Sequence, residues 1–223
     1  MLDGPRLSPA SGGKPNALVI LLHGYGSNGD DLISLAALVQ PFLPDAGFVA
    51  PEAPSQIPHM ANARQWWPIE SFSPVERASG ADAAASGLDM FITHELAQAQ
   101  LPDDRLLLIG FSQGSMMALH VGLRREQPIA GIIGISGMLV APERLAADMR
   151  SRPPVLLVHG TEDQVVPFRS MEMASRTLAA VDVRVETHVS PGLGHSVAQD
   201  GLSAAADFAR RVLASSGATP AIS

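Results

Sequence analysis

The sequence predicts an α/β fold with a mostly parallel central sheet and helices on both faces. Short apolar segments alternate along the chain with segments of helical periodicity, which is the pattern of repeated strand–helix units. Most of the apolar segments are continuously hydrophobic, as expected of parallel strands that are covered on both sides. Sheets of this kind carry their functional groups just beyond the carboxyl ends of the strands.

Six strands and five helices are expected from these patterns. The strands are predicted at 17–22, 47–50, 105–110, 129–136, 155–160 and 183–189. The last of them alternates apolar and polar residues, so it is expected near an edge of the sheet. Helical spacing of apolar residues is found at 30–39, 80–98, 113–125, 168–180 and 197–213.

The length and composition indicate one domain over residues 1–223. The chain has 46% hydrophobic and 17% charged residues, which is ordinary for a globular protein with a sizeable core. No repeat or linker divides it. The two ends, about 1–15 and 215–223, are rich in small and polar residues, and we expect them to be flexible.

Charge and cysteine content exclude several classes of partner and site. The net charge of −7 argues against binding to nucleic acid, which requires a basic face. No apolar segment is long enough for membrane insertion. The chain has no cysteine, so disulfides, thiolate nucleophiles and cysteine metal sites are excluded. No segment has the pattern of a signal peptide, and a cytoplasmic location is expected.

A candidate nucleophile follows the predicted strand 105–110. The sequence Gly110-Phe111-Ser112-Gln113-Gly114 has the pattern G-x-S-x-G between a strand and a helix, the context in which this motif exposes a reactive serine on a strained turn. The pattern also arises by chance in turns that are rich in glycine and serine. Ser136 follows another strand, but it lacks the second glycine and no helix begins after it, so we interpret it as structural or as a pocket wall.

A serine hydroxyl needs a neighbouring base, and the base needs an acid to orient it. His195 is the only histidine after the predicted strand 155–160 that also lies on a glycine-rich turn between a strand and a helix. The other six histidines lie in predicted helices, strands or turns where structural roles are expected. For the acid, the turn after strand 155–160 offers both Glu162 and Asp163, and either could instead be an ordinary surface turn residue.

The first strong strand ends in a glycine turn that suits an oxyanion hole. Its backbone can present an N–H group beside the one that follows the nucleophile. We therefore predict the backbone N–H groups of Tyr25 and Gln113 as the two donors. The alternative is an ordinary strand-to-helix turn that Asn28 caps.

A long loop at residues 51–79 holds both tryptophans of the chain. Long loops in small domains are often functional, and we predict that four apolar residues line an acyl or alcohol pocket: Trp66, Trp67, Ile69 and Phe72. The equally weighted alternative is that a tryptophan anchors this loop to the body of the protein. The spacing leaves no room for a helical cap, which predicts a shallow, open site.

Five motifs, in order and at matching spacing, resemble the phospholipase/carboxylesterase family, which includes bacterial carboxylesterases and acyl-protein thioesterases. They are LHGYGSNGDD, APEAP with the later tryptophans, GFSQGSMMAL, HGTEDQVVP and GLGHSV. The resemblance implies an α/β-hydrolase fold without a cap domain, ester hydrolysis with no metal or cofactor, and frequently a homodimer. It selects Asp163 as the acid of a Ser112–His195–Asp163 triad.

The leading functional hypothesis is a serine carboxylesterase that acts on small-molecule esters of short to medium chain length. The thioesterase branch of the family usually has Phe or Tyr and then Asp after its tryptophan, whereas this chain has Trp66-Trp67-Pro68-Ile69. An acyl-thioesterase or lysophospholipase with the same triad is the alternative. A hypothesis of another class is a non-catalytic binding protein on a hydrolase scaffold, although no triad member is missing.

Overall fold

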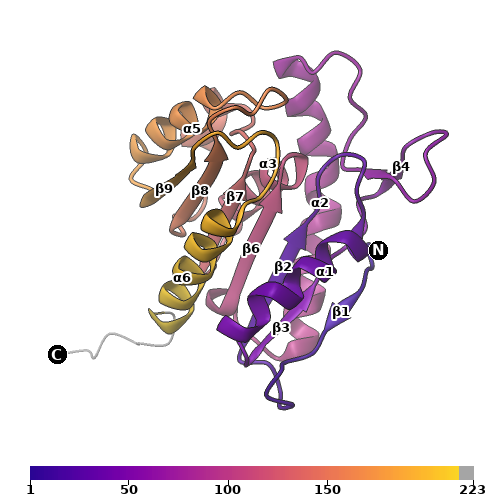
Figure 1. Cartoon of the computed structure of the whole chain (residues 1–223), viewed down its shortest axis with the longest axis vertical. Helices are drawn as coiled ribbons and strands as arrows, with labels where there is room; N and C mark the ends of the chain where they lie inside the picture. Colours follow the sequence, from indigo (N-terminus) through magenta and orange to yellow (C-terminus); the bar gives the residue numbers. More distant parts are fainter. Residues whose placement is uncertain (216–223) are drawn as a thin grey trace.

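The computed structural model describes residues 1–215, and a seven-stranded sheet forms its centre (Figure 1). The strand order is β1-β3-β2-β6-β7-β8-β9, and all neighbouring strands are parallel except β1 and β3. The prediction of a mostly parallel sheet is confirmed, with the alternating strand β9 at its edge. The strands are β1 Arg6–Leu7, β2 Ala17–Leu22, β3 Ala46–Val49, β6 Leu106–Phe111, β7 Gly131–Ile135, β8 Val155–Gly160 and β9 Val185–Ser190.

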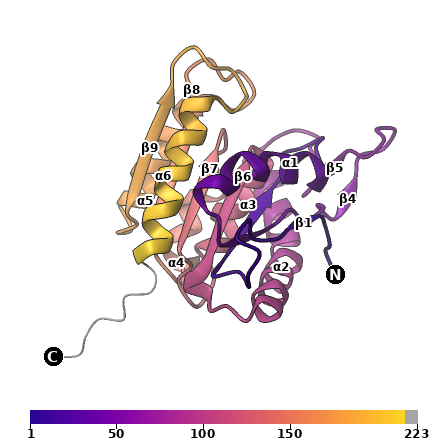
Figure 2. The ribbon, with the colours of Figure 1, turned by 60° about the horizontal axis from the view of Figure 1, so that its bottom comes forward.

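Helices cover both faces of the sheet (Figures 1 and 2). One face is covered by α1 and α6, and the other by α2, α3 and α5. None of the helices within residues 1–215 is both long enough and apolar enough to cross a membrane. The helices are α1 Gly29–Val39, α2 Pro74–Ala99, α3 Gln113–Gly122, α4 Leu145–Asp148, α5 Arg169–Ala179 and α6 Gln199–Ser215.

Two hydrophobic cores explain why the central strands are apolar at every position. Side chains alternate between the faces of a strand, so Ile20 of β2 packs in the core under α2 and α3, whereas Val19 packs under α1 and α6. Leu88 of α2 and Phe208 of α6 are fully buried in these two cores, respectively. Burying one such side chain contributes about 1.5–3 kcal/mol, so the two layers account for most of the driving force for folding.

Helix α2 begins earlier than the predicted range 80–98 because Ser73 caps its N-terminus. The side chain of Ser73 accepts a hydrogen bond from the N–H of Glu76, and Pro74 occupies the first helical position. The carboxylate of Glu76 in turn accepts hydrogen bonds from the N–H groups of Ser71 and Phe72, at 2.7 and 3.0 Å. The same residues that start the helix therefore also hold the end of the long loop.

The expectation of a flexible N-terminus is wrong for part of that segment. Arg6–Leu7 form an antiparallel strand on β3, and the guanidinium of Arg6 contacts the buried carboxylate of Glu95 at 2.7 and 3.1 Å. This two-point ion pair joins residues 89 positions apart and was not visible in local composition. At the other end, Ser215 is the last residue of α6, and the remainder of the expected flexible tail lies outside the described residues.

Within the loop at 51–79, a small hairpin stands out from the body of the protein (Figure 2). Its strands are β4 Ser55–Gln56 and β5 Arg64–Gln65, which pair antiparallel. His59 and Asn62 adopt positive φ angles of 65° and 59° in the turn between them. The loop therefore contains regular structure of its own.

A buried histidine on α3 makes stability depend on pH. His120 is 2% exposed, and its Nε2 lies 3.1 Å from the Asp82 carboxylate of α2. Its Nδ1 has no partner within the described chain. Burial, followed by the positive charge of Arg124, lowers the pKa of His120 to about 4.

Acidification should therefore destabilise the protein well above the pH at which carboxylates titrate. The unfolded chain binds a proton at His120 below its ordinary pKa of about 6.5, whereas the folded chain does not until about pH 4, so stability is lost as the pH falls through this range. Between about pH 7.5 and pH 5, the free energy of unfolding should fall by about 2 kcal/mol more in the parent than in His120→Gln. Urea unfolding at both pH values measures this difference. His94→Gln, at an exposed position of α2, is the control and should keep the parent's dependence.

Candidate active site

Ser112 lies in a sharp turn where β6 leads directly into α3. Its backbone has φ 54° and ψ −117°, a strained conformation for a residue with a side chain. Two close approaches explain the glycines on either side. A Cβ on Gly110 would lie 2.2 Å from the carbonyl oxygen of Gly114, and a Cβ on Gly114 would lie 2.0 Å from that of Leu22. The motif is thus required by backbone packing around the serine.

The structure joins Ser112, His195 and Asp163 in one chain of hydrogen bonds. Nε2 of His195 lies 3.0 Å from Oγ of Ser112, and Nδ1 lies 2.7 Å from Oδ2 of Asp163. Because a carboxylate can only accept, the imidazole proton belongs on Nδ1. Nε2 is then the acceptor for the hydroxyl proton of Ser112. These three side chains come from the carboxyl ends of β6, β8 and β9.

Asp163 is held as a buried carboxylate by its own loop. Its Oδ1 accepts hydrogen bonds from the N–H groups of Val165 and Val166, at 2.9 and 2.8 Å. His159 supports the same loop, since its Nε2 lies 2.8 Å from the carbonyl of Val166 and 3.3 Å from Asp163 Oδ2. Burial opposes the charge, but the hydrogen bonds from His195 and from the loop outweigh it and lower the pKa of Asp163. Asp163 is therefore ionised at neutral pH.

The neighbouring carboxylate, Glu162, has a different place. Its side chain is exposed, whereas its backbone N–H donates to the carbonyl of Leu193 at 2.9 Å. Thr161 accepts a hydrogen bond from the N–H of Gly192 at 2.8 Å. These two hydrogen bonds join the acid loop to the loop that carries His195. They thereby hold Asp163 and His195 close to each other.

The side chain of Asp200 holds together the two ends of the loop that carries His195. The carboxylate of Asp200, in the first turn of α6, accepts a hydrogen bond from the Ser190 hydroxyl at 2.8 Å and lies 2.8 Å from Nε2 of His188. Ser190 is the last residue of β9, so the loop begins and ends at this carboxylate. The hydrogen bonds from His188 and then Ser190 lower the pKa of Asp200 to about 2, so its carboxylate is ionised at neutral pH.

The glycine turn after β2 lies beside the serine. A Cβ on Gly24 would be 3.2 Å from Cβ of Ser112, so the two backbones are adjacent. The backbone N–H groups of Tyr25 and Gln113 donate to no protein acceptor within residues 1–215. Gln113 is also the first residue of α3, where the helix dipole favours negative charge. The two predicted donors thus belong to the backbone segments that flank the nucleophile.

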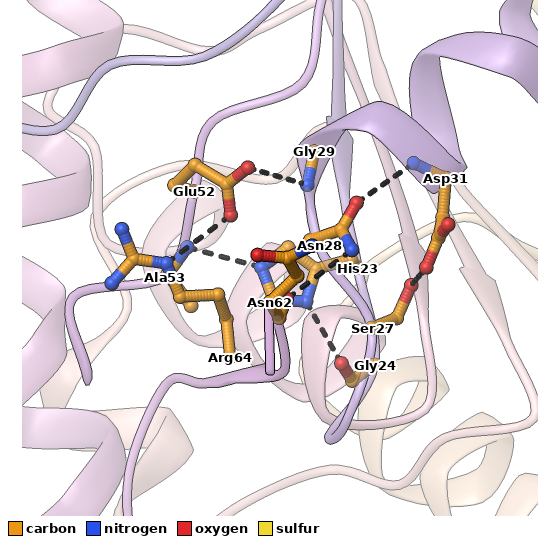
Figure 3. A network of polar contacts seen from close by, with 10 residues as sticks. All are labelled: His23, Gly24, Ser27, Asn28, Gly29, Asp31, Glu52, Ala53, Asn62 and Arg64. Atoms are coloured by element: carbon orange, nitrogen blue, oxygen red, sulfur yellow. Dashed lines mark hydrogen bonds and ion pairs between the residues drawn. The ribbon is translucent and has the colours of Figure 1, made fainter. Parts of the chain in front are cut away.

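The ring of His23 joins the glycine turn to the loop that follows β3 (Figure 3). Its Nδ1 lies 2.8 Å from the carbonyl oxygen of Gly24, and its Nε2 accepts a hydrogen bond from the N–H of Ala53 at 3.0 Å. Burial lowers the pKa of His23. The ring is therefore neutral, with its proton on Nδ1, and it uses both nitrogens to join the turn to the following loop.

The glycine turn also contacts Arg64 of β5 and Glu52, which precedes β4 (Figure 3). The backbone of Arg64 accepts from the N–H of Gly26 and donates to the carbonyl of Ser27, both at 2.9 Å. Its guanidinium meets the carboxylate of Glu52 at 3.3 Å, and that carboxylate also accepts from the N–H of Gly29 at 3.2 Å. Asn28, considered above only as a helix cap, does cap α1 through the N–H of Asp31, and the turn serves both purposes.

The two tryptophans of the loop are buried and anchor it to the body. Trp66 is 2% exposed, and its Nε1 donates to the carbonyl of His23 at 3.0 Å. Trp67 packs on α2 at Gly80, where a Cβ would lie 2.3 Å from the indole. Both tryptophans line a cavity of about 530 Å³ between the hairpin and α2, and Ser112 is not among its lining residues. The structure thus shows the anchoring role, and a pocket role for the tryptophans stays a prediction.

Ile69 and Phe72, the other two predicted pocket residues, are partly buried near the start of α2. Phe72 packs against the core under α2, and the guanidinium of Arg77 stacks 4.8 Å above its ring. Ser136 is fully buried with φ 48°, in agreement with a structural role. As walls of a substrate pocket, Ile69 and Phe72 remain predictions.

Sequence reasoning missed the supporting roles of His23, Asp200 and the Gln113 side chain. The side chain of Gln113 accepts from the N–H of Trp66 at 2.8 Å and donates to the carbonyl of Trp67 at 2.9 Å. The contact spans 47 residues, and no local pattern encodes it. For His23, its place directly before a glycine turn was a usable signal, because a ring there can reach back to the turn's own carbonyl.

Comparison with known proteins shows the family of the chain. A family model described as Phospholipase/Carboxylesterase matches residues 9–213. Acyl-protein thioesterase 1 of Neurospora crassa is 30% identical over 224 residues, covering 92% of this chain and 89% of that protein. The protein of the same name in Schizosaccharomyces pombe is 32% identical, covering 89% of this chain and 92% of that protein.

Among solved structures, the crystal structure of esterase PE8 superimposes with a TM-score of 0.91 at 43% identity, covering 95% of this chain and 99% of that chain. One conclusion follows from the shared fold, the nearly complete family match and the identity to the relatives. The protein is an α/β-hydrolase that belongs to the phospholipase/carboxylesterase family of serine hydrolases.

Proposed function

We propose that the protein is a serine carboxylesterase that hydrolyses short- to medium-chain esters through an acyl-enzyme intermediate. Ser112 is the nucleophile, His195 the general base and Asp163 the residue that orients the base. The observation that carries this proposal is the hydrogen-bonded chain from Ser112 through His195 to buried Asp163, at 3.0 and 2.7 Å, on a strained serine turn.

In the acylation step, Oγ of Ser112 forms a bond to the ester carbonyl carbon while Nε2 of His195 takes the hydroxyl proton. The π electrons of the carbonyl move to its oxygen, which the N–H groups of Tyr25 and Gln113 stabilise. Collapse of this tetrahedral intermediate re-forms the carbonyl and breaks the bond to the alcohol oxygen. The imidazolium returns its proton to that leaving oxygen.

Deacylation uses the same groups with water as the nucleophile. His195 takes a proton from water, whose oxygen bonds to the acyl carbon, and the second intermediate expels Oγ of Ser112, which is reprotonated. Asp163 stabilises the imidazolium in both steps because it stays ionised inside the protein.

We infer the preference for small substrates from the open surroundings of Ser112. Between β7 and β8 the chain forms only short helices, including α4 of four residues, so no cap covers the serine from that side. Tyr25 of the proposed donor turn and Val165 of the acid loop are 42% and 60% exposed, respectively. They offer apolar contacts to a modest acyl or alcohol group.

The second candidate is an acyl-thioesterase, which the names of the relatives from Neurospora crassa and Schizosaccharomyces pombe favour. The same three residues can act on a thioester, since only the leaving group changes. The ester p-nitrophenyl butyrate and the thioester butyryl-coenzyme A distinguish the two candidates, because kcat/KM is compared for one acyl group with an alcohol and a thiol leaving group.

Replacing the nucleophile should abolish ester hydrolysis. Ser112→Ala is expected to lower kcat on p-nitrophenyl esters on the order of 10⁴-fold or more, because no bond to the acyl group can form. The measurement is a series of p-nitrophenyl esters from acetate to palmitate, with Ser136→Ala as the control serine. A maximum at short chains supports the carboxylesterase, and a maximum at long chains favours the thioesterase or lysophospholipase. Hydrolysis that survives in folded Ser112→Ala would refute the assigned nucleophile.

Replacing the acid should slow the reaction with little effect on substrate binding. In Asp163→Asn the amide can donate to Nδ1 of His195, which favours the tautomer with its proton on Nε2 and removes the acceptor for the Ser112 proton. We expect kcat to fall on the order of 10³- to 10⁴-fold while KM changes little. Glu162→Gln is the matched control, because the adjacent carboxylate is exposed. Equal losses in the two variants would show that Asp163 has no special role.

The homodimer and the cytoplasmic location stay predictions. Sedimentation at several protein concentrations tests the first, and fractionation of the source cells tests the second.

A further inference from the structure

We propose that His23, Trp66 and Gln113 form a buried strut that sets the position of the two oxyanion donors, so that Trp66 and the Gln113 side chain are positioning residues for catalysis. This inference rests on the proposed function, because it concerns the same site. The three side chains are 0%, 2% and 1% exposed, respectively, and none of them belongs to the triad.

At one end, the strut orients the peptide group between Gly24 and Tyr25. The His23 ring donates through Nδ1 to the carbonyl oxygen of Gly24, at 2.8 Å (Figure 3). In a trans peptide the carbonyl and the N–H of the same group point in opposite directions, and no peptide bond within the described chain is cis. Holding the Gly24 carbonyl therefore aims the Tyr25 N–H the other way.

In the middle, Trp66 joins the two donor segments. Its indole Nε1 donates to the carbonyl of His23 at 3.0 Å, and its backbone N–H donates to Oε1 of Gln113 at 2.8 Å. The rings of His23 and Trp66 also pack together, with centroids 5.8 Å apart. Trp66 thus contacts both the residue before the glycine turn and the residue after the nucleophile.

At the other end, both the oxygen and the nitrogen of the Gln113 side-chain amide are hydrogen-bonded. Its Nε2 donates to the carbonyl of Trp67 at 2.9 Å, while its backbone N–H is the second proposed donor. A shift of the Trp66 backbone would be transmitted directly to the first turn of α3. Oxyanion donors are effective at about 2.7–3.1 Å from the charged oxygen of the transition state, so a rigid spacer between the two donors bears on the transition state more than on substrate binding.

The experiment separates oxyanion stabilisation from binding. Steady-state kinetics on p-nitrophenyl butyrate are combined with inhibition by propyl trifluoromethyl ketone, whose carbonyl carbon bonds to Oγ of Ser112 and whose oxygen then occupies the oxyanion hole. Two variants interrupt the strut. Trp66→Phe removes the indole donor, and Gln113→Glu removes the amide donor while keeping the size of the side chain and the backbone N–H.

Both variants should lower kcat about 10- to 100-fold and leave KM within about threefold. The Ki of the ketone should rise by the same factor by which kcat falls. Trp67→Phe is the matched control, because this equally buried tryptophan loses the same atoms but its Nε1 has no hydrogen-bond partner within the described chain. Any effect of Trp67→Phe on binding should change KM and Ki together and leave their ratio constant.

The inference is overturned if folded Gln113→Glu keeps kcat and the ketone Ki within about twofold of the parent, or if KM and Ki rise in parallel in both strut variants. Should Trp66→Phe fail to fold, Gln113→Glu decides alone. Failure of the proposed function has a different signature, since either the parent would then hydrolyse no p-nitrophenyl ester or folded Ser112→Ala would remain active. Loss of activity in Ser112→Ala with unaffected strut variants would reject only the strut.

Discussion

The strained backbone at Ser112 is the constraint on which the rest of the site depends. A positive φ at a residue with a side chain costs about 1–3 kcal/mol, and it persists only where the surroundings leave no alternative. Here β6 on one side, α3 on the other and the nearby end of β2 approach so closely that Gly110 and Gly114 cannot carry a Cβ. The packing of the sheet against α3 therefore also holds the serine in its strained turn.

The base and the acid reach the serine on loops that are tied to each other and to rigid elements. The loop of His195 is closed by Asp200 at its ends and joined to the acid loop through backbone hydrogen bonds. Asp163 is buried yet ionised because two backbone N–H groups and the imidazole compensate for its lost hydration. A loop can hold reactive groups in fixed positions when its polar groups form hydrogen bonds within the protein. The loops of Asp163 and His195 form such hydrogen bonds.

A second buried polar framework lies on the opposite side of the serine. His23, Trp66 and Gln113 satisfy one another inside an otherwise apolar region, where an unpaired donor or acceptor would be costly. The long loop is thereby made part of the body, and its tryptophans serve first as anchors. Together the two frameworks surround Ser112 with groups that have few alternative positions, which is the physical basis of preorganised catalysis.

The sequence alone determined the fold class and the turns that bear the candidate triad. This is because parallel buried strands, helix periodicity and the G-x-S-x-G turn are local patterns. Six strands, five helices and the loops that bear Ser112, Asp163 and His195 follow from such patterns. Tertiary structure decided what depends on contacts distant in sequence: the pairing of Arg6–Leu7 with β3, the burial of Asp163 beside exposed Glu162, and the contact of Gln113 with Trp66. Periodicity records which face a residue turns to the core, but it carries no information about which distant backbone group that residue meets there.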